Sequence, residues 1–160
     1  MARVASDGPF SAFPGIDRTL TVVSGCGLSL RTAGRDATTL SVGTAPFAFS
    51  GDTPTEARLT NGPILDLNVM TRRRLYRHAL LPITRSAEHR LPDYRSAAVL
   101  ISLDGSTHLH GLASGCPVRL DHGDAAVIEA AAATVRVAPG PGALAWLVLL
   151  YRAGSQAGCR

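Results

Sequence analysis

The stretch Gly62-Pro-Ile-Leu-Asp-Leu-Asn-Val-Met70 decides the fold class. Its side chains alternate in character with a period of two, which is typical of a β-strand with two different faces. Leu65, Leu67 and Val69 share one face, and Asp66, Asn68 and Met70 share the other. The apolar face is the expected core face. In a barrel, however, the second face could line a cavity, and the pattern leaves both arrangements open.

Strand-like patterns cover most of the remaining chain, and Gly- and Pro-containing turns separate them. The predicted strands are residues 18–23, 28–31, 38–42, 46–52, 64–70, 74–83, 97–103, 107–113, 118–120, 125–129, 134–137 and 143–151. A polar loop is expected from the end of the strand at 74–83 through about Arg95. The alanine-rich stretch 129–134 is too short to be a stable helix by itself. The sequence therefore predicts an all-β barrel or sandwich.

Length and composition indicate one folded domain. The chain has 160 residues, of which 46% are hydrophobic and 18% charged, as expected for a packed core. We predict a single domain over residues 1–152 and a flexible C-terminal tail over 153–160. No apolar run approaches the roughly 20 residues that span a bilayer, so no membrane association is expected.

The positive charge is concentrated in one stretch. All 16 basic residues are arginine, and the net charge is +4. Residues 72–95 carry a net charge of +5, which leaves −1 for the rest of the chain. No nucleic-acid-binding motif accompanies the arginines, so no nucleic-acid partner is expected. A solvated hairpin is the favoured interpretation, and a contact surface for a protein partner is the alternative.

The three cysteines are widely spaced and odd in number. They predict neither a disulfide framework nor a CxxC metal site. Cys26 and Cys116 are expected in or near the core, and Cys159 is expected to be exposed. This cysteine usage favours a cytoplasmic protein.

A loop rich in glycine and proline leads into the strand at 18–23. It reads Asp7-Gly-Pro-Phe-Ser-Ala-Phe-Pro-Gly-Ile-Asp-Arg18. Phe10 and Phe13 could anchor this loop, and alternation places Asp17 and Arg18 on opposite faces of the strand. One interpretation is a purely structural loop in which Arg18 pairs with an acid.

The polar face of the strand at 64–70 is a candidate binding surface. If Asp66 and Asn68 point inward, they need hydrogen-bond partners, because buried polar groups without partners are costly. A ligand could supply those partners. The alternative is that both side chains face solvent or hold a neighbouring turn.

A metal site is not expected, although His108 and His110 would lie on one strand face and His122 follows. Barrels that bind a metal this way usually have a glutamate four or five residues later, where this chain has Ser114 and Gly115. No catalytic triad, P-loop or nucleotide-binding fingerprint is present. We therefore expect no cofactor and assign no catalytic residue.

In combination, these segments resemble the HutD/Ves family of cupin-like bacterial proteins. The matching segments are Asp7-Gly-Pro-Phe-Ser-x-Phe-Pro-Gly-x-Asp-Arg18, Gly25-x-Gly27-x-x-Leu30, Phe49-x-Gly-Asp52, Asp66-Leu-Asn-Val-Met-x-Arg72 and Gly123-Asp124. The resemblance implies an RmlC-like cupin jelly-roll barrel without the usual cupin metal ligands. It also implies a regulator of histidine utilisation that binds a small pathway acid, such as urocanate or formylglutamate, without turning it over.

The resemblance suggests roles for the candidate residues. Arg18 could bind the carboxylate of the ligand bidentately. Asp66 could accept an imidazole N–H, and Asn68 could donate or accept a hydrogen bond. Phe10, Phe13 and Met70 could provide apolar walls.

Two other functions remain open. The first is a metal-independent cupin isomerase or lyase with Asp66 as the general base and Arg18 as an electrostatic stabiliser. The second is a β-barrel that binds a protein partner through residues 72–95.

The chain departs from the family pattern at its beginning. Family members have an upstream segment with a Trp- and Gly-rich motif and a first strand, whereas this sequence begins with Met1-Ala-Arg-Val. We therefore expect the barrel to be N-terminally incomplete. A missing strand would leave an exposed sheet edge, through which a homodimer could form.

Overall fold

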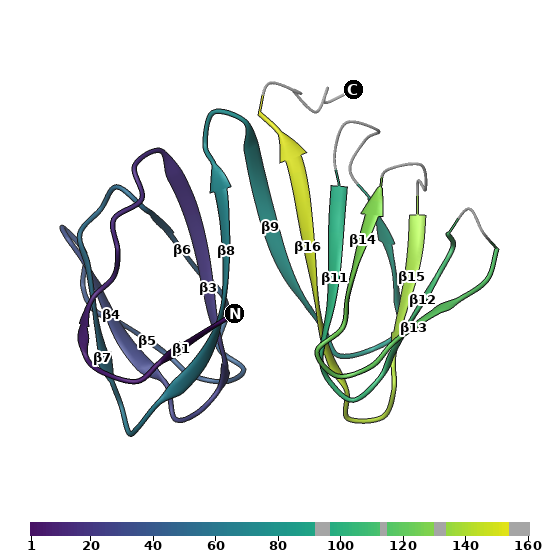
Figure 1. Cartoon of the computed structure of the whole chain (residues 1–160), viewed down its shortest axis with the longest axis horizontal. Coiled ribbons are helices and arrows are strands. Elements are labelled where there is room, and N and C mark those ends of the chain that lie inside the picture. Colours follow the sequence, from purple (N-terminus) through teal and green to yellow (C-terminus); the bar gives the residue numbers. More distant parts are fainter. Residues whose placement is uncertain (92–96, 113–114, 130–133, 154–160) are drawn as a thin grey trace. The chain divides into compact units, whose positions relative to one another are not determined.

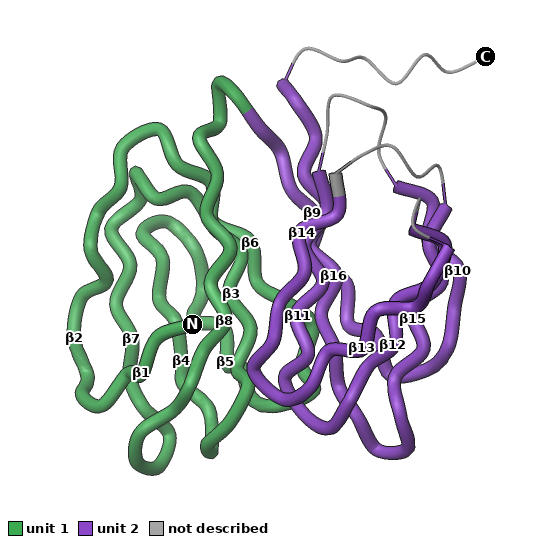
Figure 2. The backbone as a smooth tube through the Cα atoms, turned by 45° about the vertical axis from the view of Figure 1, so that its right-hand side comes forward, with its two compact units in different colours: residues 1–75 green, residues 76–160 purple. Residues whose placement is uncertain are grey.

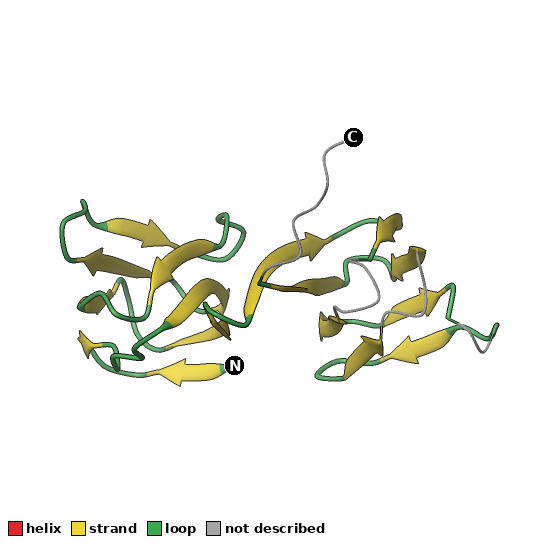
Figure 3. Cartoon of the chain, turned by 90° about the horizontal axis from the view of Figure 1, so that it is seen from above, coloured by secondary structure: helices red, strands yellow, loops and turns green. Residues whose placement is uncertain are grey.

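The computed structural model describes residues 1–91, 97–112, 115–129 and 134–153. All regular structure in these ranges is β-strand, and no helix occurs in them (Figure 3). Every strand pairing in these ranges is antiparallel, so the all-β prediction is confirmed. The described part of the chain has no helix of the length and apolarity that a membrane span requires.

Contacts between residues divide the chain into two compact units (Figure 2). Unit 1 comprises Met1–Leu75, and unit 2 comprises Tyr76–Arg160. The single domain over residues 1–152 stays a prediction. Most of the tail predicted at 153–160 lies outside the described residues.

Unit 1 is built from two four-stranded antiparallel sheets (Figure 1). The first has the order β1 (Ala2–Val4), β8 (Ile64–Arg72), β3 (Ile16–Ser24), β6 (Phe47–Ser50). The second has the order β2 (Gly8–Pro9), β7 (Thr55–Leu59), β4 (Leu28–Thr32), β5 (Thr38–Leu40). The two sheets enclose a shared core, whose buried members are Leu20, Val22, Leu28, Leu30, Leu40, Phe49, Ala57 and Ile64.

Unit 2 repeats this arrangement with a larger apolar core. One sheet has the order β14 (Ala125–Glu129), β11 (Ala97–Asp104), β16 (Leu144–Arg152), β9 (Tyr76–Ile83). The other has the order β10 (Ala87–Arg90), β15 (Thr134–Pro139), β12 (Thr107–His110), β13 (Val118–Leu120). The buried core residues are Ile83, Leu91, Ala98, Leu100, Leu109, Leu120, Ile128, Val135, Val137, Ala145, Leu147 and Leu149.

The register between β3 and β8 shows which face of β8 points into unit 1. Leu20 lies opposite Asn68, and Val22 lies opposite Asp66. Directly opposed residues share a face of the sheet. Because Leu20 and Val22 belong to the core, Asp66 and Asn68 also face the interior. The polar face of β8 therefore points into the barrel of unit 1, which is the second of the two arrangements that the pattern left open, while Leu67 on the apolar face is also buried.

Four strands were not expected from the sequence: the very short β1 and β2, and also β7 and β10. β7 alternates between buried and exposed positions, but its buried members are the small residues Thr55 and Ala57, which give a weak hydrophobic signal. β10 lies within the predicted polar loop. It is short, and its exposed residues Glu88 and Arg90 are charged, so its sequence is as polar as that of a loop.

The expected burial of the cysteines is wrong for the two described ones. Cys26 and Cys116 are both exposed. Cys26 lies in the turn between β3 and β4, and Cys116 lies just before β13. Connecting segments run over the surface because a buried loop would leave backbone polar groups without partners. Cys159 lies outside the described residues.

Candidate functional site

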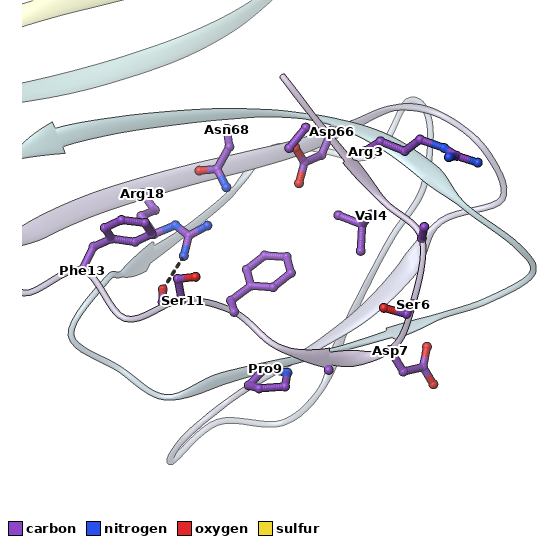
Figure 4. A pocket seen from close by; sticks show the side chains of 14 residues that line it. Arg3, Val4, Ser6, Asp7, Pro9, Ser11, Phe13, Arg18, Asp66 and Asn68 are labelled. Atoms are coloured by element: carbon purple, nitrogen blue, oxygen red, sulfur yellow. Dashed lines mark hydrogen bonds between the residues drawn. The ribbon is translucent and has the colours of Figure 1, made fainter.

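A cavity of about 470 Å³ lies in unit 1. Its size is within the range of small-molecule sites. Residues 2–11 line it together with Phe13, Arg18, Asp66 and Asn68. Figure 4 shows Arg18, Asn68 and Asp66 along one wall, facing the N-terminal segment. β1 extends the sheet at this wall, because it pairs with β8, with Ala2 opposite Asp66.

Arg18 is an almost fully buried cation in this wall. Its exposed fraction is 6%, and its Nη1 donates a hydrogen bond to the carbonyl oxygen of Ser11 at 3.2 Å. Three aromatic rings surround its Cζ, with centroid distances of 5.1 Å to Phe10, 5.5 Å to Phe13 and 4.9 Å to Phe49. These distances are within cation–π range. The rings stabilise the charge, but burial still lowers the pKa of Arg18, and nearby Asp66 only partly offsets this.

The structure does not pair Arg18 with an acid. The ion pairs among the described residues do not include Arg18, so the prediction of a paired Arg18 is wrong. Asp17, on the opposite face of β3, instead binds Arg73, with 2.7 Å between Oδ1 and Nε. Arg18 therefore retains hydrogen-bonding capacity for another group.

Asp66 is the second buried charged group of the wall. Its exposed fraction is 2%, and its Oδ1 has no hydrogen-bond partner. Burial raises the pKa of Asp66, whereas a hydrogen bond from the backbone N–H of Ala2 and the charge of Arg18 act in the opposite direction. A carboxyl group in this environment can accept a hydrogen bond when ionised and donate one when protonated.

Three polar atoms of the wall are buried without a hydrogen-bond partner. They are Arg18 Nε, Asp66 Oδ1 and Asn68 Oδ1. Each such atom costs free energy unless a partner satisfies it. Their gathering around one cavity is the arrangement expected of a binding site for a polar small molecule.

The structure brings together five of the six predicted site residues. Arg18, Asp66, Asn68, Phe10 and Phe13 all line the cavity. Met70 lies opposite Arg18 in the register between β3 and β8, but it is 38% exposed and is not part of the lining.

Sequence reasoning missed several contributors to the site. Phe49 contacts Arg18, although its motif in the sequence indicates no role in a site. Ser11 accepts a hydrogen bond from Arg18 through its backbone carbonyl, a contact that no side-chain pattern indicates. Val4 and Ser6 line the opposite wall, and the short strand β1 has no clear sequence signal.

The histidines of β12 lie outside this cavity. His108 and His110 have ring centroids 6.4 Å apart and alternate with the buried residues Thr107 and Leu109. They therefore share one face of their strand, as predicted, and the structure shows that this is the outer face of the sheet. The described residues contain no group of three or more His, Cys, Asp or Glu side chains that could hold a metal ion.

Comparisons with solved structures support the cupin-like architecture. HutD from Pseudomonas fluorescens is 25% identical with a TM-score of 0.80, and the match covers 95% of this chain and 77% of that chain. A conserved protein of unknown function from Pseudomonas aeruginosa is 26% identical with a TM-score of 0.83, covering 95% and 80%. A cupin 2 conserved barrel domain protein from Leptotrichia buccalis shares the fold at 15% identity and a TM-score of 0.54, covering 93% and 81%.

The predicted cupin jelly-roll fold is thus confirmed. The HutD family model matches residues 1–146, which is most of the chain. Membership of that family suggests a role in histidine utilisation. This match shows that the chain belongs to the HutD family.

Proposed function

We propose that this chain is a binding protein of histidine utilisation, and that the cavity of unit 1 takes up a small carboxylated metabolite and releases it unchanged. Urocanate and formylglutamate are the leading candidates. Binding would limit or tune flux through the pathway. The observation that carries the proposal is the buried guanidinium of Arg18 in the same cavity wall as two buried side-chain oxygens without hydrogen-bond partners, Asp66 Oδ1 and Asn68 Oδ1.

Arg18 would bind the carboxylate of the metabolite. Its hydrogen bond to Ser11 uses Nη1, which leaves the edge formed by Nε and Nη2 for a ligand. The guanidinium fork matches the two oxygens of a carboxylate, and such pairs are stronger than neutral hydrogen bonds. An anionic ligand would also offset the desolvation that lowers the pKa of Arg18.

Asp66 and Asn68 would bind the other end of the metabolite. They are two residues apart on one strand face, a separation of about 6.6 Å. Both present an oxygen without a partner, so the complementary ligand group is an N–H donor. Urocanate has a carboxylate at one end and an imidazole N–H at the other. Formylglutamate has carboxylates and an amide N–H, which fits the same pattern.

An enzyme is the second candidate function, because the pKa of Asp66 is raised by burial. Carboxyl groups in clefts with raised pKa values are candidates for general acid–base catalysis. In that case Asp66 would move a proton and Arg18 would stabilise the developing negative charge. Loss of turnover in Asp66→Asn would support this function over simple binding.

A thermal-shift screen of histidine-pathway acids tests the proposal. Urocanate and formylglutamate should raise the melting temperature, because a ligand at 100 times its Kd stabilises by about 2.7 kcal/mol. Imidazole, which lacks the carboxylate, is the matched control ligand and should have little effect. Chromatography of the samples should recover both acids unchanged. If no carboxylate shifts the melting temperature, the proposed binding function is wrong.

A further inference from the structure

A cluster of exposed charged and polar side chains lies next to the cavity without lining it. Arg73 is at its centre: Nε donates to Asp17 Oδ1 at 2.7 Å, and Nη2 donates to Asp52 Oδ2 at 2.7 Å and to Ser50 Oγ at 2.7 Å. We call Arg73, Asp17, Asp52 and Ser50 the Arg73 clasp. It links the end of β8, the start of β3 and the turn after β6.

The Arg73 clasp holds the loop that precedes β3. The backbone N–H of Gly15 donates to Asp52 Oδ1 at 2.8 Å, and the backbone N–H of Arg73 donates to the carbonyl oxygen of Gly15 at 2.9 Å. Arg73 Nη2 also lies 3.3 Å from the carbonyl oxygen of Ile16. Hydrogen bonds from Gly15, Arg73 and Ser50 keep the pKa of Asp52 at about 2. Asp52 is therefore ionised at neutral pH.

Gly51 fixes the distance between this loop and the turn after β6. The N–H of Phe13 donates to the carbonyl oxygen of Gly51 at 2.8 Å. The N–H of Gly51 donates to the carbonyl oxygen of Ile16 at 2.7 Å. A Cβ atom at Gly51 would lie 2.6 Å from the carbonyl oxygen of Phe13. Only glycine permits this approach without a shift of the loop.

The held loop carries two groups that contact Arg18. The ring of Phe13 lies 5.5 Å from Arg18 Cζ, and Ser11 accepts the hydrogen bond from Nη1. Phe13 is 40% exposed, so core burial alone does not fix its position. Exposed ion pairs contribute only about 0–1 kcal/mol each to global stability. The Arg73 clasp is therefore better suited to ordering this loop than to stabilising the whole fold.

We propose that the Arg73 clasp holds Phe13 and Ser11 over Arg18 and thereby controls how small molecules reach the guanidinium. Arg73 is a positioning residue in this account, because it acts through the loop and does not line the cavity. The effect on metabolite affinity rests on the proposed function, whereas the shielding of Arg18 does not.

The first test measures shielding without any metabolite. Phenylglyoxal modifies accessible arginines, and mass spectrometry of peptides gives the rate at each site. In Arg73→Ala, modification of Arg18 should be several-fold faster than in the wild-type protein, with a melting temperature that changes little. Arg119→Ala is the matched control, because Arg119 forms an exposed ion pair with Asp121 at 2.8 Å. An unchanged rate at Arg18 in Arg73→Ala would overturn the proposal.

The second test uses urocanate and isothermal titration calorimetry. Arg73→Ala should weaken binding about two- to tenfold, as expected when one side chain must be ordered on binding. Arg73→Lys should restore only part of the affinity, because lysine cannot bind Asp17 and Asp52 with a planar fork. In a Phe13→Ala background, Arg73→Ala should cost less, since the group that it positions is gone.

The two tests separate the two proposals. If the wild-type protein does not bind urocanate or formylglutamate, the proposed function fails, and the phenylglyoxal rates still decide whether the Arg73 clasp shields Arg18. If the wild-type protein binds urocanate and Arg73→Ala binds it equally well, the role of the Arg73 clasp is wrong and the proposed function stands.

Discussion

Units 1 and 2 are built alike, from two four-stranded antiparallel sheets each, but different side chains face their interiors. Unit 2 has a broad apolar core. Seven of its eight strands, all except β10, contribute buried residues to this core. In unit 1, part of the interior is instead lined by Arg18, Asp66 and Asn68, which surround a cavity. The two units therefore use one architecture for different purposes: a packed interior and a polar site.

Buried polar atoms without a hydrogen-bond partner occur among the described residues of both units, but in unit 1 three of them gather around the cavity. In unit 2, the buried hydroxyls of Ser102 and Thr107 lie 3.3 Å apart and bond to each other. In unit 1, Asp66 is equally buried, yet its Oδ1 has no partner. The half-buried His89 of unit 2 also has an unpartnered Nε2, and burial lowers its pKa. Polar groups that lack partners mark where a fold gives up stability, and functional sites are common at such places.

The largest expected effect concerns the packed interior of unit 2. Leu147→Ala should lower the free energy of unfolding by about 2–5 kcal/mol, because it opens a cavity in a closely packed core. Urea denaturation measures this change. Val127→Ala is the matched control: Val127 is 70% exposed on β14, and its loss should change stability by no more than about 0.5 kcal/mol. Equal effects of the two substitutions would contradict the packed interior.

The next effect concerns affinity in the polar interior of unit 1. Arg18→Ala should weaken urocanate binding by about 1.5–3 kcal/mol, the range for a hydrogen bond to a charged group. Arg18→Lys should recover only part of this loss, because it lacks the bidentate geometry. Asn68→Ala should also weaken binding. Calorimetric titration measures each change, and wild-type affinity in both alanine variants would place the binding site elsewhere.

A smaller effect concerns the pH dependence of stability. Burial raises the pKa of Asp66 above its ordinary value of 3.8, so the folded state favours the protonated carboxyl group. The resulting stabilisation is present below pH 3.8 and is lost as the pH rises through the raised pKa. Asp66→Asn cannot ionise, so wild-type stability should fall relative to this variant over that rise. Parallel stability curves from acid to neutral pH would show that Asp66 has no raised pKa.

The smallest effect is expected on the outer face of unit 2. The double substitution His108→Ala/His110→Ala should change stability by no more than about 0.5 kcal/mol, as is usual for surface positions. Elemental analysis of the wild-type protein should find no stoichiometric zinc, iron or manganese. A one-to-one metal that disappears in the double variant would overturn the metal-free interpretation of this cupin.

The long alternating segments explain why the fold class could be predicted. β8 and β3 alternate over most of their length, and this pattern depends only on local sequence. The interior face of β8 could not be chosen in this way, because the choice depends on its register with β3. The pairing of Val22 with Asp66, together with the burial of Asp66, shows that a carboxyl group occupies a core position.

The site was predicted in part for the same reason. Arg18, Asp66 and Asn68 follow from alternation combined with a family resemblance. Phe49 and Ser11 reach Arg18 from other segments, and such contacts depend on tertiary structure. The Arg73 clasp joins residues more than 20 positions apart in the chain, so no local pattern could reveal it.

Equilibrium dialysis of urocanate against the wild-type protein and Arg18→Ala tests the central claim most directly. The cavity around Arg18 should bind one urocanate for each wild-type chain, and chromatography should recover it unchanged. Arg18→Ala should retain little urocanate at the same concentration. Equal retention by the two proteins, or conversion of urocanate by the wild-type protein, would contradict the account.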